Sequence, residues 1–127
     1  MTKFTWEHIH LRSPDPEATA AWYRDKLGAE VVKSPQADGS FRIDLNLSGQ
    51  KVFIAKALQG KAAEAPSSPY FGLEHFGLTV PDIEQAVKEL KAKGVAFTMD
   101  VTEARPGVRI AFLKAPENVS IELIQRG

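Results

Sequence analysis

The sequence nearly repeats itself after 67 residues. The stretch that begins at His8 (HIHLRSPDPE) returns at His75 as HFGLTVPDIE. In both copies the histidine opens an expected strand, and a Pro-Asp pair then precedes an expected helix. A duplicated unit would bring its two equivalent histidines together across a pseudo-twofold axis. Because paired histidines are a common beginning of a metal site, the repeat points to metal-binding chemistry.

Each half of the chain predicts the same order of elements, strand-helix-strand-strand-strand. Asp15 and Asp82 are the expected N-caps of the two helices, and Gly28 is the expected stop of the first. The first half predicts strands over residues 4–12, 29–34, 40–48 and 50–57 and a helix over residues 17–27. The second half predicts strands over residues 72–80, 95–101, 107–114 and 118–125 and a helix over residues 83–93.

These elements predict an α+β fold in which two tandem β-α-β-β-β modules form a cup-shaped mixed sheet with the helices outside. One domain would span residues 1–127, with module one over residues 1–57 and module two over residues 70–127. Residues 58–69 (LQGKAAEAPSSP) are small, polar and bounded by proline, so we interpret them as the linker. The concave surface of the cup is where we expect a functional site.

The composition excludes several classes of partner. Sixteen basic and sixteen acidic residues cancel, so no overall charge attracts nucleic acid or an anionic membrane. No run of about 18 apolar residues is long enough for a membrane span. The absence of cysteine excludes disulfides and thiolate chemistry. Since the first residues lack the apolar core of a signal peptide, we expect a cytoplasmic protein. With nucleic acid and membranes excluded as partners, we expect its partner to be a small-molecule substrate.

Several motifs resemble those of the vicinal-oxygen-chelate superfamily. They are the two histidine-to-Pro-Asp starts, residues 22–28 (WYRDKLG) and residues 116–125 (PENVSIELIQ). The superfamily includes glyoxalase I, methylmalonyl-CoA epimerase, extradiol dioxygenases, fosfomycin-resistance transferases and bleomycin-binding proteins. The resemblance covers nearly the whole chain and implies a single glyoxalase-like domain. It does not identify a reaction, because one scaffold hosts all these functions.

The resemblance also implies a set of metal ligands, taken from the first and last strand of each module. In this sequence the four positions are His8, His75, Glu122 and, by the 67-residue offset, Ala55. Alternation independently predicts that Glu122 points away from the helix, because Ile121 and Leu123 should face it. A carboxylate buried there without a partner would be costly, so a nearby cation is expected. Two imidazoles and one carboxylate suit Fe(II), and the same set could accept Mn, Zn, Ni or Co.

Other interpretations of these residues remain open. Both histidines could simply line the cup while Glu122 pairs with an arginine such as Arg109. His10 shares the strand face of His8. It could line the cavity, orient the ligands, move a proton or, in a shifted register, replace His8 as ligand.

The strand over residues 40–48 predicts the polar lining of the cup. Arg42, Asp44 and Asn46 alternate with three apolar residues that should pack on the helix. By the repeat, Arg109 should face the cup as well, and Phe53 and Thr79 should share that surface. Two guanidinium groups suit an anionic substrate. The resemblance makes Asp44 a candidate general base, because epimerase-like members carry an acidic base there. The alternative is that Asp44 merely forms an ion pair with Arg42 or Arg109.

The function implied is that of a small metal-dependent enzyme acting on an oxygen-chelating carbonyl, enolate or diol. Isomerase or lyase chemistry is slightly favoured, although Ala55 lacks the proton-carrying group that glyoxalase I uses at such a position. An extradiol-type Fe(II) dioxygenase and a metal-free drug-sequestering protein of the bleomycin-resistance kind are the alternatives. We also expect a homodimer, because each half-sheet has edge strands that would be unpaired in an isolated chain.

Overall fold

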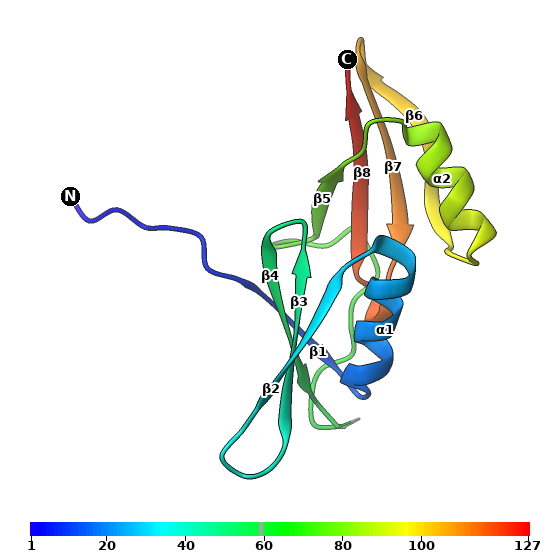
Figure 1. Ribbon diagram of the computed structural model, residues 1–127. Coiled ribbons are helices and arrows are strands. Elements are labelled where there is room, and N and C mark those ends of the chain that lie inside the picture. Colours follow the sequence, from blue (N-terminus) through cyan, green and yellow to red (C-terminus); the bar gives the residue numbers. More distant parts are fainter. Residues whose placement is uncertain (59) are drawn as a thin grey trace. The chain divides into compact units, whose positions relative to one another are not determined.

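The computed structural model describes residues 1–58 and 60–127 as an α+β chain (Figure 1). It divides into two compact units, Met1–Ala63 and Glu64–Gly127. The division falls inside the stretch that the sequence predicts as a linker, of which residue 59 lies outside the described residues. Each unit contains one helix and one four-stranded mixed sheet, as the sequence predicts.

The first unit has the element order strand-helix-strand-strand-strand. Its elements are β1 (Ile9–Ser13), α1 (Pro16–Leu27), β2 (Glu30–Pro35), β3 (Phe41–Leu47) and β4 (Gln50–Lys56). The strands lie in the order β1-β4-β3-β2, with β1 parallel to β4 and the other pairs antiparallel. Because β1 and β4 are parallel, the chain must cross between them, and α1 is part of that crossover.

The second unit repeats this topology. Its elements are β5 (His75–Thr79), α2 (Ile83–Ala92), β6 (Phe97–Arg105), β7 (Val108–Lys114), the short 3₁₀ turn η1 (Pro116–Asn118) and β8 (Ser120–Arg126). The strand order is β5-β8-β7-β6, with the same single parallel pair. Neither α1 nor α2 is long and apolar enough to cross a membrane, and no other described helix is either.

The two helices begin in the same way. The Asp15 carboxylate accepts a hydrogen bond of 3.1 Å from the Ala18 amide, and the Asp82 carboxylate accepts one of 3.1 Å from the Gln85 amide. These are N-caps, which satisfy backbone donors that the first turn leaves free. Gly28 ends α1 with a φ of 72°, a left-handed conformation that glycine adopts without steric cost.

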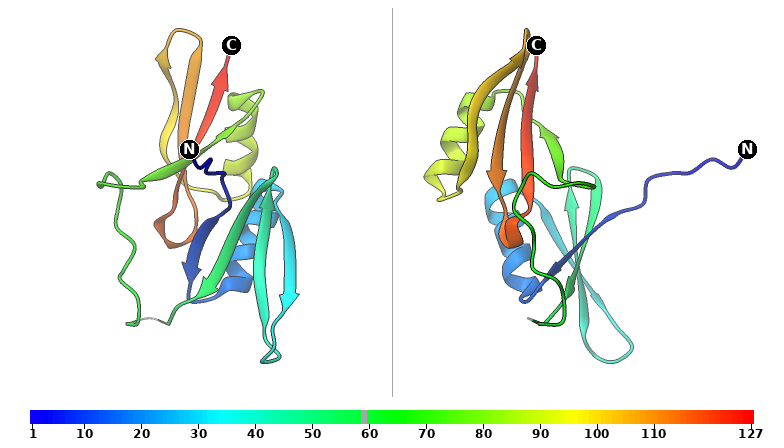
Figure 2. Two further views of the ribbon diagram at one scale, coloured as in Figure 1. Left: turned by 90° about the vertical axis from the view of Figure 1, so that its left-hand side faces the viewer. Right: turned by 180° about the vertical axis from the view of Figure 1, so that it is seen from behind.

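Each helix covers one face of its own sheet (Figure 2). In the first unit Tyr23 of α1 packs in a core with Leu45 and Val52 of the sheet, all of them buried. In the second unit the same layer contains the buried side chains of Ile83, Val87, Leu90, Leu113, Ile121 and Leu123. The opposite face of each sheet, here called its open face, carries the polar and aromatic candidates with the exception of Arg109.

The first strand is shorter than the sequence predicts. It begins at Ile9, so His8 lies one residue before β1, and the expected strand over residues 4–12 is wrong at its start. Ile9 pairs with Val52, and β4 begins only two residues earlier at Gln50, so the chain before Glu7 extends beyond the start of its partner strand (Figure 1). The expected strand over residues 72–80 is likewise confined to His75–Thr79.

Candidate functional site

Glu122 lies on the open face of the second unit. Its neighbours Ile121 and Leu123 are buried on the α2 side, so alternation turns the carboxylate the other way. Glu122 is paired with Gly77 of β5, and a Cβ at Gly77 would come within 3.5 Å of Glu122 Oε1. That distance is an ordinary van der Waals contact, so the Glu122 carboxylate lies directly beside Gly77 on the open face.

His75 lies two residues before Gly77 on the same strand face. Its Nδ1 is 2.7 Å from Glu74 Oε1, and the Ser68 hydroxyl donates to Glu74 Oε2 at 2.6 Å. The hydrogen bonds from Ser68 and then from His75 hold the pKa of Glu74 below its usual value. The imidazole also meets Phe112 edge to face, with ring centroids 4.9 Å apart. His75 and Glu122 thus come from neighbouring strands and share one face.

A pocket of about 460 Å³ opens beside His75 within the second unit. The sheet contributes a cation and a hydroxyl to it, because Lys114 of β7 is paired with Ser120 of β8. The segment before β5 contributes Ser67, Ser68, Pro69 and Glu74. The lining includes Ser68, Glu74, His75, Phe112, Lys114 and Ser120. Such a pocket can accept a small molecule that has both polar and apolar parts.

Phe53 is the centre of a cluster on the open face of the first unit. The His8 imidazole stacks on its ring at 4.1 Å between centroids, and His10 approaches at 6.5 Å nearly edge-on. The Arg42 guanidinium carbon lies 4.7 Å from the centre of the same ring. We call these four residues, His8, His10, Arg42 and Phe53, the Phe53 cluster. A positive group above an aromatic ring is suited to a flat, anionic ligand.

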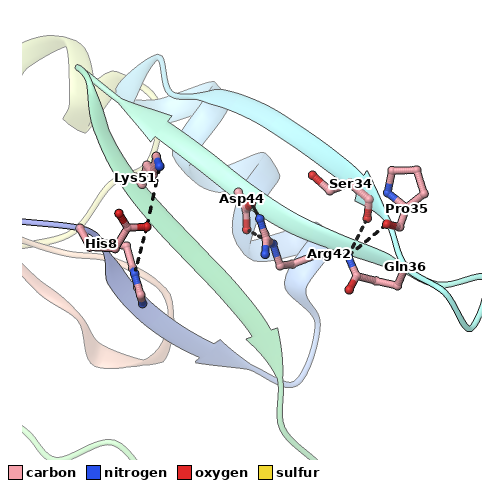
Figure 3. A network of polar contacts seen from close by, with 8 residues as sticks. His8, Ser34, Pro35, Gln36, Arg42, Asp44 and Lys51 are labelled. Atoms are coloured by element: carbon pink, nitrogen blue, oxygen red, sulfur yellow. Dashed lines mark hydrogen bonds and ion pairs between the residues drawn. The ribbon is translucent and has the colours of Figure 1, made fainter.

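Asp44, the candidate general base, forms an ion pair with Arg42. Arg42 Nε lies 3.1 Å and 3.0 Å from the two carboxylate oxygens of Asp44, and Nη2 donates to Oδ2 at 2.8 Å (Figure 3). Asp44 is buried, so this pairing compensates its charge. The ion pair that the sequence analysis gives as the alternative is therefore present, and both oxygens of Asp44 are engaged in it. The roles of Asp44 and His10 in proton transfer stay predictions.

Asn46 and Arg109 each have a partner within their own unit. Asn46 Oδ1 accepts a hydrogen bond of 2.7 Å from the Gly49 amide and closes the turn between β3 and β4. Arg109 pairs with Glu84 of α2 and so lies on the helix side of its sheet. The expectation that Arg109 faces the cup is wrong.

The strand register explains this error. His10 pairs with Phe53 in the first unit, and its 67-residue equivalent Gly77 pairs with Glu122 in the second. Along β4 and β8 the offset is therefore 122 − 53, which is 69. Asp44 pairs with Phe53 and Phe112 pairs with Glu122, so the offset along β3 and β7 is 112 − 44, which is 68. A one-residue drift moves Arg109 to the other face.

The two-residue drift along β4 and β8 corrects the fourth ligand position. Phe53, and not Ala55, occupies the register position of Glu122, while Ala55 pairs with Arg12. Neither side chain has an atom that binds a metal, so the three-residue set is unchanged. His8 belongs to the first unit, and His75 and Glu122 belong to the second. Across residues 1–58 and 60–127, the structure shows no group of three or more His, Asp or Glu side chains close enough together to hold a metal ion.

Two residues of the site escape the sequence analysis, namely Ser68 and Glu74. A signal for Glu74 was present, because Glu-His occurs at residues 7–8 and again at residues 74–75 with the 67-residue spacing. No comparable signal exists for Ser68, whose contact depends on the path of an irregular segment.

Similar proteins are consistent with this fold. An uncharacterised protein of Bacillus subtilis, YwkD, is 29% identical over 121 residues, which are 94% of each chain. Mouse mitochondrial methylmalonyl-CoA epimerase is 30% identical over 109 residues, which cover 79% of this chain and 58% of that protein. The crystal structure of a glyoxalase family protein from Enterococcus faecalis matches with a TM-score of 0.75 and 25% identity, covering 94% of this chain and 96% of that one.

The family model for this architecture matches residues 5–123, nearly the whole of both units. Together with the doubled β-α-β-β-β topology, the match means that the chain belongs to the Glyoxalase/Bleomycin resistance protein/Dioxygenase superfamily.

Proposed function

We propose that this protein is a small metal-dependent enzyme that acts on an oxygen-chelating carbonyl or enolate substrate by isomerase or lyase chemistry. The observation that carries the proposal is the placing of His75 and Glu122 on one face of neighbouring strands, with the His75 ring held by Glu74. A metal-binding histidine commonly donates its second ring nitrogen to a carboxylate in this way. The donor set fits a divalent ion, and His8 of the first unit would be the third ligand.

When bound, the divalent metal ion would supply Lewis-acid stabilisation of a substrate oxyanion. Arg42 and Phe53 would bind and orient the anionic, planar part of the substrate, since the guanidinium already lies over the ring. His10, exposed on the same face, would take and return the substrate proton at an imidazole nitrogen. Asp44 would act through Arg42 by fixing its guanidinium. The similarity to an epimerase supports proton-transfer chemistry of this kind.

The metal site is tested by titration and elemental analysis. Protein purified without added metal should contain, or take up, about one divalent ion per chain. The variants His8→Ala, His75→Ala and Glu122→Ala should each weaken Zn²⁺ affinity by on the order of a hundredfold, because each removes one of three bonds. Glu117→Gln, an exposed glutamate of η1, is the matched control and should bind as the unchanged protein does. If Glu122→Ala binds Zn²⁺ normally, the proposed ligand set is wrong.

A second candidate is an extradiol-type Fe(II) dioxygenase. It is favoured by one observation: neither Phe53 nor Ala55 offers a fourth ligand atom, so positions would stay open for substrate and oxygen. Screening the metal-loaded protein against acyl-CoA thioesters, 2-oxo thiohemiacetals and catechols separates the two reactions. Failure to take up any metal, combined with binding of a drug, would instead favour a sequestering protein. A cytoplasmic location stays a prediction from the sequence.

A further inference from the structure

We propose that Ser68 and Glu74 form a hydrogen-bonded relay that fixes the His75 imidazole in one tautomer, with the proton on Nδ1 and the lone pair on Nε2. Both are positioning residues, because they act on a substrate or metal only through His75. The inference rests on the proposed function insofar as it gives the fixed Nε2 a metal to bind. The tautomer itself is a property of the protein alone.

The direction of each hydrogen bond follows from the chemistry of the carboxylate. An ionised glutamate can only accept hydrogen bonds, so the nitrogen that lies 2.7 Å from Glu74 Oε1 must carry the proton. The Ser68 hydroxyl donates to the other oxygen at 2.6 Å. Both distances are typical of charge-assisted hydrogen bonds, which are about twice as strong as neutral ones. With Nδ1 protonated, a neutral His75 has its lone pair on Nε2.

Two further contacts restrict movement of the relay. The Tyr70 hydroxyl donates to the backbone carbonyl of Glu74 at 3.1 Å, which holds the residue from its main chain. The His75 imidazole also contacts Phe112, whose ring lies at 88° to it. The ring is therefore fixed both at one nitrogen and against an aromatic neighbour. A histidine whose ring is held in this way loses less conformational entropy when it binds a metal ion.

The other copy of the repeat lacks this arrangement. Glu7 precedes His8 as Glu74 precedes His75, but His8 Nδ1 lies 3.8 Å from Glu7 Oε1, beyond hydrogen-bond distance. The Glu7 carboxylate is also 3.7 Å from Lys51 Nζ (Figure 3). The repeat thus contains one oriented histidine and one that is only stacked on Phe53. We infer that His75 is the preorganised ligand and that the relay belongs to the second unit alone.

The tautomer is measured by nitrogen-15 NMR of the His75 side chain in the metal-free protein near pH 8, and Zn²⁺ affinity is measured by competition with a chromophoric chelator. The unchanged protein should show the proton on Nδ1. Glu74→Gln should give a mixture of tautomers and weaken Zn²⁺ binding by about 10- to 100-fold. Ser68→Ala should shift both readouts in the same direction by less, and Ser68→Thr, which keeps the hydroxyl, should restore them.

Matched controls come from the same chain. Ser67→Ala, next to Ser68, and Glu64→Gln, an exposed glutamate of the same unit, should leave both readouts unchanged. Glu7→Gln should have a much smaller effect than Glu74→Gln. The relay is overturned if the unchanged protein carries the proton on Nε2, or if Ser68→Ala and Glu74→Gln leave the tautomer as it was. A fixed tautomer in a protein that binds no Zn²⁺ would support the relay and refute the proposed metal site, so the two failures are distinguishable.

Discussion

Tyr23 carries a buried hydroxyl without a hydrogen-bond partner among the residues that the structure describes. The side chain lies in α1 and faces the sheet of the first unit, where it is fully buried and in edge-to-face contact with Trp22. Burial raises the pKa of Tyr23 well above its usual value, because the phenolate would have to leave water. The buried Tyr23 hydroxyl therefore destabilises the folded state, whereas burial of the Tyr23 ring stabilises it.

We predict that Tyr23→Phe is at least as stable as the unchanged protein at neutral pH. Removing a buried, unpaired hydroxyl should recover up to about 1 kcal/mol, measured by urea unfolding. Burial raises the pKa of the phenol in the folded state, so the unfolded state ionises first, above about pH 10, and the stability of the unchanged protein falls as pH rises above that value. Tyr23→Phe should lose less stability than the unchanged protein in that range.

Tyr70→Phe is the contrasting variant, because it removes the hydrogen bond to the Glu74 carbonyl. It should lose about 1 kcal/mol. A loss of comparable size in Tyr23→Phe would show that the Tyr23 hydroxyl is satisfied by an ordered water molecule.

At the scale of the elements, β4 and β8 are equivalent strands of the two units, but their register is shifted by two residues from the 67-residue offset of the repeat. By register, Phe53 of β4 corresponds to Glu122 of β8, whereas a constant 67-residue offset points to Ala55. Phe53→Glu should therefore add a fourth ligand, the second carboxylate of the set, and tighten Zn²⁺ binding on the order of tenfold, or about 1.4 kcal/mol. Calorimetric titration measures this gain.

Ala55→Glu is the matched variant for the register. Ala55 lies on the same open face, two residues further along β4, and should produce little gain. Tighter binding in Ala55→Glu than in Phe53→Glu would mean that the sequence offset, and not the strand register, identifies the fourth position.

Alternation and capping were enough to predict the order of elements, both N-caps and the direction of Glu122, because these depend on neighbours a few residues away. The orientation of Arg109 was predicted wrongly because the offset between β3 and β7 is 68 residues and not 67. A shift of one residue along a strand moves a side chain to the opposite face of the sheet. Ser68 could not be found, since its contact with Glu74 depends on side-chain geometry in a segment without periodic structure.

At the scale of the whole molecule, the chain exposes apolar side chains at repeated positions. Phe4 and Phe71 are separated by 67 residues, as are Trp6 and Leu73, and all four lie in the segments that precede β1 and β5. Their exposed fractions are 87%, 105%, 73% and 81%, respectively. Where large exposed apolar side chains form a contiguous patch, they commonly mark a surface that a partner covers. The edge strands of each sheet also leave backbone groups unpaired.

We predict that these features are covered in a homodimer, the commonest closed assembly of identical chains. Light scattering at micromolar concentration should give twice the mass of one chain. The double variant Phe4→Ser/Trp6→Ser should move the protein toward the monomer, because each substitution removes roughly 1.5–3 kcal/mol of apolar burial at such an interface. Phe41→Ser, which removes an exposed aromatic side chain of β3, is the control and should stay dimeric. A protein that is monomeric and yet binds Zn²⁺ through His8, His75 and Glu122 would mean that a single chain supplies the complete site.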